Sequence, residues 1–332
     1  MNWGLIFWNA VYTAVSANAA GYCLVASGLN VHVGYTGLLN FGQAAFAAVG
    51  AYFVAVPIAE YQWPWYWAVL LALGASMMLA LLLGIPTLRL RADYLAIVTI
   101  AAAEILRFFL ASARFTWLTG GPNGKNGWTG FLADANPWQD RAEPFRLFSQ
   151  PIDGYRFFML LVGWTLVLLV AFLVWLLMRS PWGRVLKSIR EDEDAARSLG
   201  KNVLFYKLQS LMLGGVIGSL GGLVISAQKQ SAQQGEFATT LTFFAFTIMI
   251  IGGLGRVKGP IVGTIIFFFV IQFVDNVLNQ ATRLGKLPEW LVDTGNYGQV
   301  RFIIAGLALA LLVVFRPQGI FGDRREQVFD VR

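Results

Sequence analysis

Long runs of apolar residues alternate with short polar segments along most of this chain. A transmembrane helix needs about 20 consecutive, mainly apolar residues to cross the hydrocarbon core of a bilayer. Spans are expected at residues 5–29, 41–59, 63–85, 94–113, 157–178, 208–227, 237–254, 260–278 and 302–315. The pattern therefore predicts an all-α polytopic membrane protein with about nine transmembrane helices.

Residues 30–40 interrupt this pattern between the first two apolar runs. The segment reads NVHVGYTGLLN, with no Lys or Arg and with polar side chains between glycines. Irregular backbone at membrane depth persists only where protein or a water-filled cavity satisfies its polar groups. We therefore expect one broken or re-entrant helix here, and this leaves the orientation of the N-terminus open.

Composition agrees with a membrane protein. Of the 332 residues, 57% are hydrophobic and 13% are charged, and the mean hydropathy is +0.61. Soluble domains carry roughly 25% charged residues. With one Cys and one His, neither a disulfide framework nor a His/Cys metal cluster is expected. The basic residues behind the net charge of +7 lie mostly beside apolar runs, so they indicate topology and not nucleic-acid binding.

The distribution of basic residues orients the expected helices. With nine crossings, 15 of the 25 Lys and Arg residues fall on one side, which the positive-inside rule assigns to the cytoplasm. That side holds the segment 180–207 and the tail 323–332, and the other side holds the loop 114–156 and the N-terminus. The sequence thus predicts a permease domain over residues 1–322, in which the outer loop forms a lid or a receptor-docking surface.

The segment 180–207 is strongly charged and lies between two apolar runs. We expect a helix capped by Ser180, with Pro181 in its first turn and Gly200 after its end. A helix lying on the lipid surface is one interpretation of its apolar stripe. Four consecutive acids, residues 191–194, do not suit an anionic inner leaflet. We therefore predict a docking surface for a soluble partner.

Two groups of residues are candidates for the transport path. In the interrupted segment, glycines permit unwound backbone and polar side chains offer hydrogen bonds; these candidates are Gly34, Tyr35, Thr36, Gly37, Asn40 and Gln43. Tight helix packing through small residues explains them equally well. Glu104 and Arg107 lie on one face of the fourth span, three residues apart. They are either a structural ion pair or part of the path, because charges inside a bilayer face a partner or a wet cavity.

No nucleotide-binding motif occurs in the chain. GGPNGK at residues 120–125 has Thr119 where a phosphate loop needs Gly and Asn126 where it needs Ser or Thr. No cofactor, metal site or enzymatic activity is expected, so any ATP would be bound by separate subunits.

Six blocks in family order resemble the high-affinity branched-chain amino acid ABC importer permeases. They are GYTGLLNFGQAAFAAVGAY (34–52), LRLRADYLAIVTIAAAEILR (88–107), LTGGPNG (118–124), GRVLKSIREDEDAARSLG (183–200), IGGLGRVKGPIVG (251–263) and FRPQGIFG (315–322). The resemblance implies a multi-pass protein of a prokaryotic cell membrane. Its implied partners are a related second permease, two cytoplasmic ATPases and an extracytoplasmic substrate-binding protein.

ABC importer permeases carry a coupling motif, E-A-A-x-x-x-G. This chain keeps the spacing with Asp in the first position, but residues 210–213 read SLML where the motif ends in Ile-x-Leu-Pro. The resemblance thus assigns ATPase coupling to the segment as a whole. The residues expected to take part are Arg184, Arg190, Glu191, Asp192, Glu193, Asp194, Ala195, Ala196 and Gly200.

Two alternatives to branched-chain amino acid import remain at this stage. Urea and short-amide ABC importers resemble the same group closely. An ion-coupled secondary transporter would belong to a different class, and such proteins commonly place ionisable residues at the membrane midplane within inverted repeats. This interpretation leaves the charged segment 180–207 without a role.

Overall fold

The computed structural model describes residues 2–88, 92–139, 143–147, 150–284, 297–315 and 319–321. Arg89, Arg91 and the expected tail 323–332 lie outside them. The helices are α1 Trp3–Ala14, α2 Ala17–Leu29, α3 Gln43–Tyr61, α4 Trp65–Thr87, α5 Ala92–Ala111, α6 Thr116–Thr119, α7 Gly130–Asp134, α8 Gly154–Arg179, α9 Pro181–Glu191, α10 Glu193–Ser198, α11 Val203–Lys229, α12 Thr239–Gly252, α13 Lys258–Arg283 and α14 Tyr297–Phe315. A π-helical turn covers Asn30–Tyr35.

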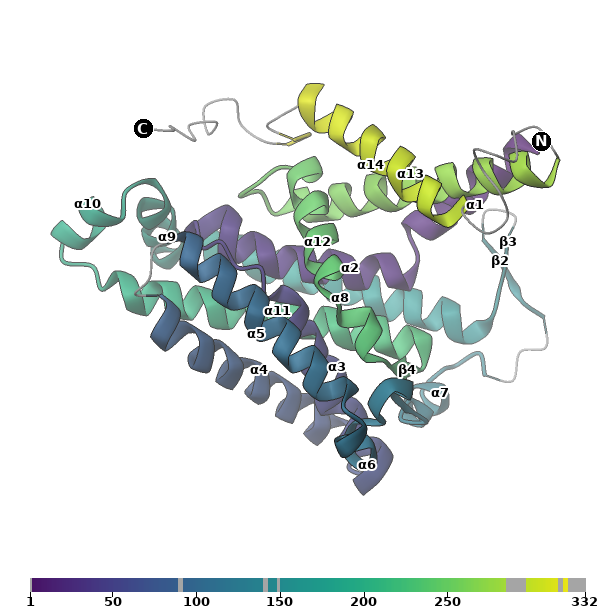
Figure 1. Cartoon of the computed structure of the whole chain (residues 1–332), viewed down its shortest axis with the longest axis horizontal. Helices are drawn as coiled ribbons and strands as arrows, with labels where there is room; N and C mark the ends of the chain where they lie inside the picture. The colour runs from purple at the N-terminus through teal and green to yellow at the C-terminus, as the bar shows by residue number, and fades with distance from the viewer. Residues whose placement is uncertain are drawn as a thin grey trace.

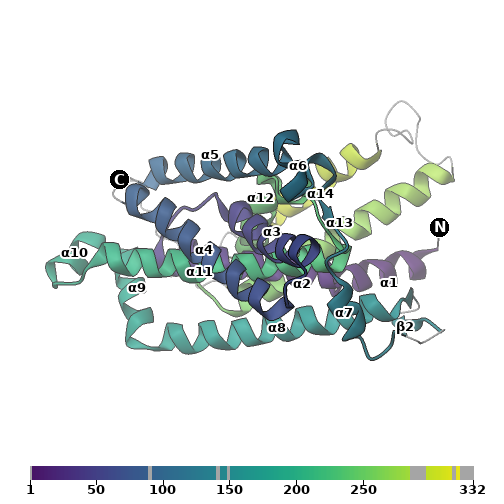
Figure 2. The same ribbon diagram turned by 90° about the horizontal axis from the view of Figure 1, so that it is seen from below.

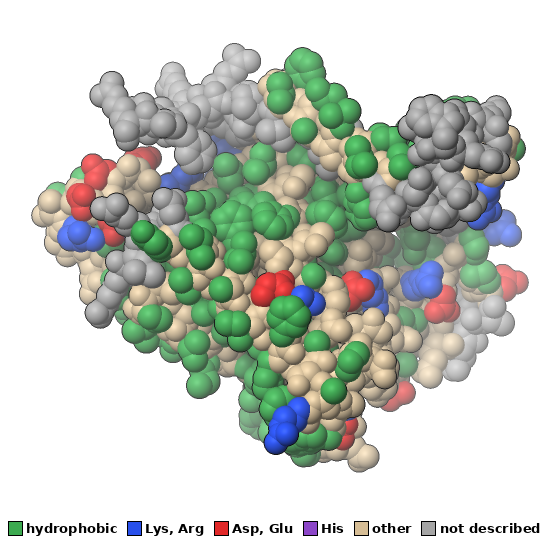
Figure 3. All heavy atoms as spheres, viewed as in Figure 1, with side chains coloured by type: hydrophobic (Ala, Val, Ile, Leu, Met, Phe, Trp, Pro, Cys, Tyr) green, Lys and Arg blue, Asp and Glu red, His purple; other side chains and the backbone are tan. Residues whose placement is uncertain are grey.

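Six of the described helices are long and apolar enough to cross a membrane. They are α3, α4, α5 from Tyr94 onward, α8, α11 and α13, and α12 is a shorter apolar helix. Large hydrophobic side chains face outward along these helices, and Figure 3 shows them covering much of the middle of one face. A polytopic helical membrane protein is therefore confirmed, while the number of nine crossings stays a prediction.

The first expected span is divided in two. The chain leaves helical geometry at Ser16, whose ψ of 164° is extended, and the Ser16 hydroxyl accepts the N–H of Ala19 at 3.3 Å. This is an N-cap, which Ser favours because its short side chain satisfies a free backbone donor. The prediction of one helix over 5–29 is therefore wrong, and α1 instead packs along α13 through an Asn9–Asn276 hydrogen bond of 3.3 Å.

The predicted interruption after residue 29 is confirmed. The π-helical turn continues α2, and residues 37–42 are then non-helical until α3 begins at Gln43. Gly37 has a φ of +76°, a left-handed conformation that glycine adopts at little cost. The second expected span thus consists of a short extended stretch followed by α3.

Helix α11 is the centre of the bundle, where it packs against α2, α3 and α4 (Figure 1). Its glycines let neighbouring backbones approach: a Cβ at Gly222 would lie 1.9 Å from the Ala47 carbonyl oxygen, and one at Gly50 would lie 2.0 Å from that of Ser219. Close backbone contact through small residues is the usual way membrane helices pack, because lipid provides no hydrophobic driving force between them.

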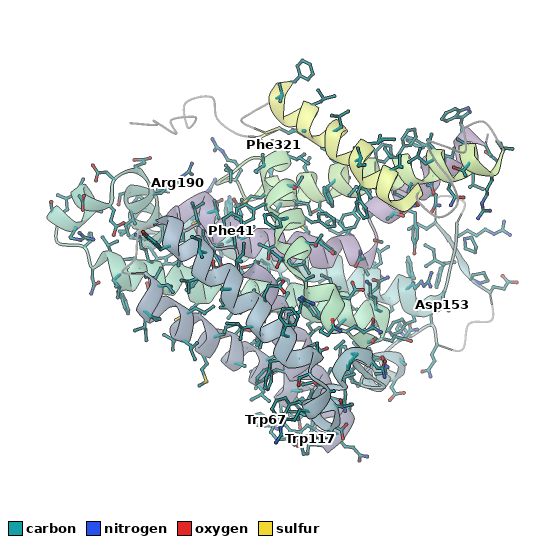
Figure 4. All side chains as sticks on the ribbon, in the orientation of Figure 1. Phe41, Trp67, Trp117, Asp153, Arg190 and Phe321 are labelled. Atoms are coloured by element: carbon teal, nitrogen blue, oxygen red, sulfur yellow. The ribbon has the colours of Figure 1, made fainter. Side chains whose placement is uncertain are left out.

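The two ends of the bundle differ in character. Helices α9 and α10 lie at one end of the long axis, and the hairpin of β2 Phe145–Leu147 and β3 Gln150–Ile152 lies at the other (Figures 1 and 2). Exposed aromatic side chains, which favour membrane interfaces, gather on the α3–α4 connection and α6. Figure 4 shows two of them, Trp67 and Trp117, close together and far from Arg190.

The outer loop is tied to the helices beneath it. Strand β1 Lys125–Asn126 pairs antiparallel with β4 Ser231–Ala232, which follows α11. Lys125 also forms an ion pair with Glu60 near the end of α3, and Trp128 is completely buried. The loop is therefore anchored along its first half, and its use as a lid or docking surface stays a prediction.

Candidate coupling and transport site

The charged segment forms two short helices and not the single helix expected from its pattern. Asp192 adopts an extended conformation, and its carboxylate accepts the N–H groups of Asp194 and Ala195, both at 2.9 Å. Asp192 therefore ends α9 and caps α10, which corrects the prediction of one continuous helix. Pro181 does stand in the first turn of α9, and Gly200 has the expected left-handed φ of +77° after α10.

One face of this segment is anchored on the membrane helices. Leu186 is completely buried in a cluster with Val174 and Met178 of α8. Ile189 and Ala196 are buried together with Val203 of α11. Ala196 thus has a packing role, whereas Ala195 is exposed. The apolar stripe predicted from the sequence faces the protein.

The four consecutive acids have different surroundings. Glu193 forms ion pairs with Arg197, at 3.0 Å, and with Lys207 of α11, while Asp192 serves as the cap. Asp194 is paired with Arg197 at 3.3 Å, but its side chain is 90% exposed, and Glu191 is exposed as well. Figure 3 shows these charges gathered at the α9–α10 end. Of the four acids, Glu191 and Asp194 are therefore exposed carboxylates that neither cap α10 nor pair with Lys207.

Arg190 points in the opposite direction, into the protein. Its guanidinium donates a hydrogen bond to the carbonyl of Gly34 in the π-helical turn. A Cβ at Gly255 would lie 3.0 Å from Arg190 Nη1, and one at Gly37 would lie 3.4 Å from Arg190 Cγ. Arg190 therefore fills the space between the interrupted segment and the turn that joins α12 to α13. Figure 4 shows it toward the α9–α10 end of the bundle.

Asn30 completes the link between these elements. Its Oδ1 accepts the N–H of Gly255 at 2.9 Å, and its Nδ2 donates to the Arg256 carbonyl at 3.0 Å. A Cβ at Gly34 would lie 2.1 Å from Asn30 Oδ1, so only glycine fits. We call Asn30, Gly34, Arg190 and Gly255 the junction. It connects α9 with two chain segments that belong to the membrane part.

The C-terminal part of the described chain contacts the end of α12, next to the junction. The N–H groups of Ile320 and Phe321 donate to the carbonyls of Ile251 and Gly252, at 2.9 and 3.1 Å. These carbonyls end α12, directly before the turn that Asn30 holds. Ile320 and Phe321, which belong to the block that the sequence singled out without assigning a role, thus lie on the α12 side of the same turn.

A buried polar network lies deeper in the bundle. His32 Nε2 is 3.1 Å from the Leu211 carbonyl and Nδ1 is 3.0 Å from Asn40 Nδ2. Because the carbonyl only accepts and the amide nitrogen only donates, these contacts assign a neutral imidazole protonated on Nε2. Gln43 accepts from Asn40 at 3.3 Å and donates to the Gly214 carbonyl at 3.1 Å. Sequence reasoning missed His32, although its place in the interrupted segment was a signal.

The candidate path residues of this segment are therefore brought together and enclosed. Thr36 hydrogen-bonds Ser210 at 2.6 Å, and Gly34, Tyr35, Thr36, Asn40 and Gln43 are all buried, whereas Gly37 is exposed. They join the interrupted segment to α11. The contacts favour the packing interpretation in this conformation. No group of three or more His, Cys, Asp or Glu side chains suited to a metal ion occurs among the described residues.

Glu104 and Arg107 form a separate ion pair on α5. Arg107 Nη2 is 2.7 Å from Glu104 Oε2, and their side chains are 29% and 24% exposed. Glu104 Oε1 also accepts the backbone N–H of Thr239 at 3.3 Å and the Thr239 hydroxyl. Thr239 begins α12, where a carboxylate is favourable because of the helix dipole. The pair therefore fastens α5 to the N-terminus of α12.

Comparisons with known proteins identify the family of the chain. The family described as branched-chain amino acid transport system permease component matches residues 11–292. The high-affinity branched-chain amino acid transport system permease protein LivM of Escherichia coli K12 is 33% identical over 317 residues, covering 92% of this chain and 69% of the relative. The corresponding protein of Methanocaldococcus jannaschii is 23% identical over 345 residues, with 91% of both chains covered. The autoinducer 2 import permease LsrC of Escherichia coli O9:H4 is 28% identical over 156 residues, or 46% of this chain and 42% of the relative.

Proposed function

The chain belongs to the family of branched-chain amino acid transport permeases, and from this premise we propose that it is the membrane-spanning subunit of an ABC importer that moves branched-chain amino acids inward. The family match over residues 11–292 is the observation that carries the proposal. The charged α9–α10 segment at one end of the bundle supports it, since a permease without a phosphate loop needs a surface for an external ATPase.

We assign partners from the charged and polar surfaces at the two ends of the helix bundle. Two cytoplasmic ATPases bind ATP and dock on the α9–α10 face through Glu191 and Asp194. A related second permease completes the membrane unit, and an extracytoplasmic binding protein docks on the loop 114–156. The chain crosses a prokaryotic cell membrane about nine times with its C-terminus in the cytoplasm. It carries no cofactor, binds no nucleic acid and catalyses no reaction.

The junction gives this proposal a route for movement. ATP binding shifts a two-state equilibrium only if the ATPases contact the two states differently. A displacement of α9 changes the position of Arg190 and therefore of the π-helical turn and the α12–α13 turn that Arg190 contacts. Transport follows when this displacement opens the interrupted segment after α2 first toward one side of the membrane and then toward the other.

Uptake by the reconstituted complex tests the substrate. Proteoliposomes are prepared with the chain, its second permease, the ATPases and the binding protein, with the ATPases and ATP inside the vesicles. They are expected to accumulate labelled leucine and not labelled urea. The chain alone should transport neither substrate and hydrolyse no ATP. Urea uptake by the complex would instead assign an amide importer. Leucine uptake by the single chain on a proton or sodium gradient would contradict an ABC mechanism.

Neutralising the two exposed acids, Glu191→Gln with Asp194→Asn, is expected to weaken ATPase association about fivefold or more. The expected effect is limited because each exposed charge pair contributes modestly to an interface. The fold of the segment should persist, because Asp192 caps α10 and Glu193 pairs with Arg197, and both residues are unchanged in this variant. The measurement is ATPase co-purification over a range of salt concentrations. The matched control, Asp134→Asn with Glu143→Gln, removes two exposed acids from the opposite end. Equal retention of ATPase in both variants would show that the acids are only a solvated face.

A further inference from the structure

A partly open groove lies between α10, the start of α11 and the end of α4. Its volume is about 520 Å³. The side chains that matter to its chemistry are Leu88, Glu193, Arg197, Lys201, Asn202 and Lys207. The groove thus has polar and charged walls, and it belongs neither to the junction nor to the buried network around His32.

The groove carries an excess of positive charge. Glu193 is its one acid and pairs with both Arg197, at 3.0 Å, and Lys207. Lys201 is exposed, and it forms no ion pair within the part of the chain that the structure describes. Arg197 is also paired with Asp194, which does not line the groove, so Lys201 is the cation that makes the groove suited to an anion.

The position of the groove corresponds to the edge of a bilayer. Leu88 ends α4 and Asn202 caps α11, where its side chain accepts the N–H of Phe205 at 3.2 Å. Both helices are long and apolar enough to span a membrane, so the groove lies at the level where spans end. Beside it, Leu204 and Phe205 on the first turns of α11 are 37% and 53% exposed. Cations next to exposed apolar side chains are the combination that a lipid headgroup and its acyl chains require.

We propose that this groove binds the phosphate of an anionic phospholipid from the cytoplasmic leaflet. Lys201 is the principal contact, Arg197 and Lys207 supply the surrounding positive potential, and the acyl chains lie along Leu204 and Phe205. The acids of residues 191–194 do not exclude an anionic lipid here. The exposed Glu191 and Asp194 do not line the groove, and Glu193, which does, is neutralised by Arg197 and Lys207. The proposal requires only that the chain is embedded in a membrane with this end inward. It is independent of the substrate that is transported.

Lipid selectivity of the full-length chain tests this site. The chain is reconstituted in phosphatidylcholine vesicles that contain either spin-labelled phosphatidylglycerol or spin-labelled phosphatidylcholine, and the immobilised fraction of each is measured. Lys201→Glu is expected to reduce the preference for phosphatidylglycerol about fivefold or more, since each basic residue near an anionic leaflet contributes about that factor. Lys187→Glu is the control, because Lys187 is an exposed lysine on α9 that does not line the groove.

Every other result overturns the proposal, and each one points to a different alternative. An equal loss of preference in both variants would indicate a general surface potential, and no loss in Lys201→Glu would exclude the groove. Displacement of the labelled lipid by inorganic phosphate would assign a free-anion site. If Lys201→Glu leaves the lipid preference unchanged but releases the ATPases more than Lys187→Glu does, the groove is a protein contact. Lys201→Gln, which removes the charge without reversing it, provides the same comparison if the glutamate variant does not fold.

Discussion

Arg190→Ala is expected to lower ATP-driven uptake by the assembled importer more than tenfold while ATPase association and ATP hydrolysis persist. Arg190 is on α9, in the segment proposed to dock the ATPases, yet its guanidinium reaches Gly34 and lies against Gly255. Alanine removes this connection and leaves the Gly34 carbonyl without a charged donor, and hydrogen bonds to charged groups contribute about 1.5–3 kcal/mol each. The ATPases would then move α9 without moving the interrupted segment, so hydrolysis continues without transport.

The comparison that separates transmission from docking uses two further variants. Asn30→Ala, on the membrane side of the junction, should reproduce the uncoupling because Asn30 holds Gly255 and Arg256. Lys187→Ala, an exposed residue of the same helix, should retain both uptake and hydrolysis. Uptake and ATPase activity are measured on the same proteoliposomes. If Arg190→Ala instead releases the ATPases, Arg190 belongs to the docking surface and does not transmit motion.

Changing Glu104 and Arg107 together is expected to restore most of the stability that either single change removes. Glu104→Gln leaves a lone cation within a membrane helix, and Arg107→Gln leaves a lone carboxylate. A charge at the centre of a membrane helix costs about 2.5–3.5 kcal/mol. The double variant has no charge left to bury, and Gln at position 104 retains an oxygen to accept the Thr239 N–H. Thermal stability in detergent and uptake by the assembled complex measure the two effects.

These measurements distinguish the structural and transport interpretations of the ion pair. The hydrogen bonds from Thr239 to Glu104 favour a fastening role, in which the double variant is both stable and active. A double variant that is well folded and assembled with its partners but inactive in uptake would place the pair in the transport path. Loss of assembly in the double variant alone would show that the charges are needed by a neighbouring subunit.

Much of the architecture follows from local sequence. The lengths of the apolar runs predicted α3, α4, α8 and α13 to within a few residues, because lipid imposes a minimum length on each helix. The interruption after residue 29 was visible as polar residues among glycines. Pro181 and Gly200 marked the two ends of the α9–α10 segment because their backbone preferences are local.

Breaks caused by single side chains were harder to predict. Ser16 and Asp192 each end one helix and cap the next through hydrogen bonds to backbone N–H groups. A Ser or Asp side chain can also lie on the surface of a continuous helix. The apolar pattern continues on both sides of each residue, so the pattern alone does not reveal the break. Whether the helix continues or breaks depends on whether the following helix buries more surface by packing in a new direction.

Partners that lie far apart in the chain were decided only by the tertiary structure. Composition, hydropathy and motif order determined the membrane class, the positions of most long apolar helices, the charged segment between α8 and α11, and the family resemblance. Arg190 and Gly34 are 156 residues apart and Asn30 and Arg256 are 226 apart, so no local pattern pairs them. The sequence placed Arg190 among the residues expected to take part in ATPase coupling, and the tertiary structure adds that its side chain turns inward to the Gly34 carbonyl. The direction of a long charged side chain depends on which carbonyls remain unsatisfied nearby, and only the folded chain brings those carbonyls within reach.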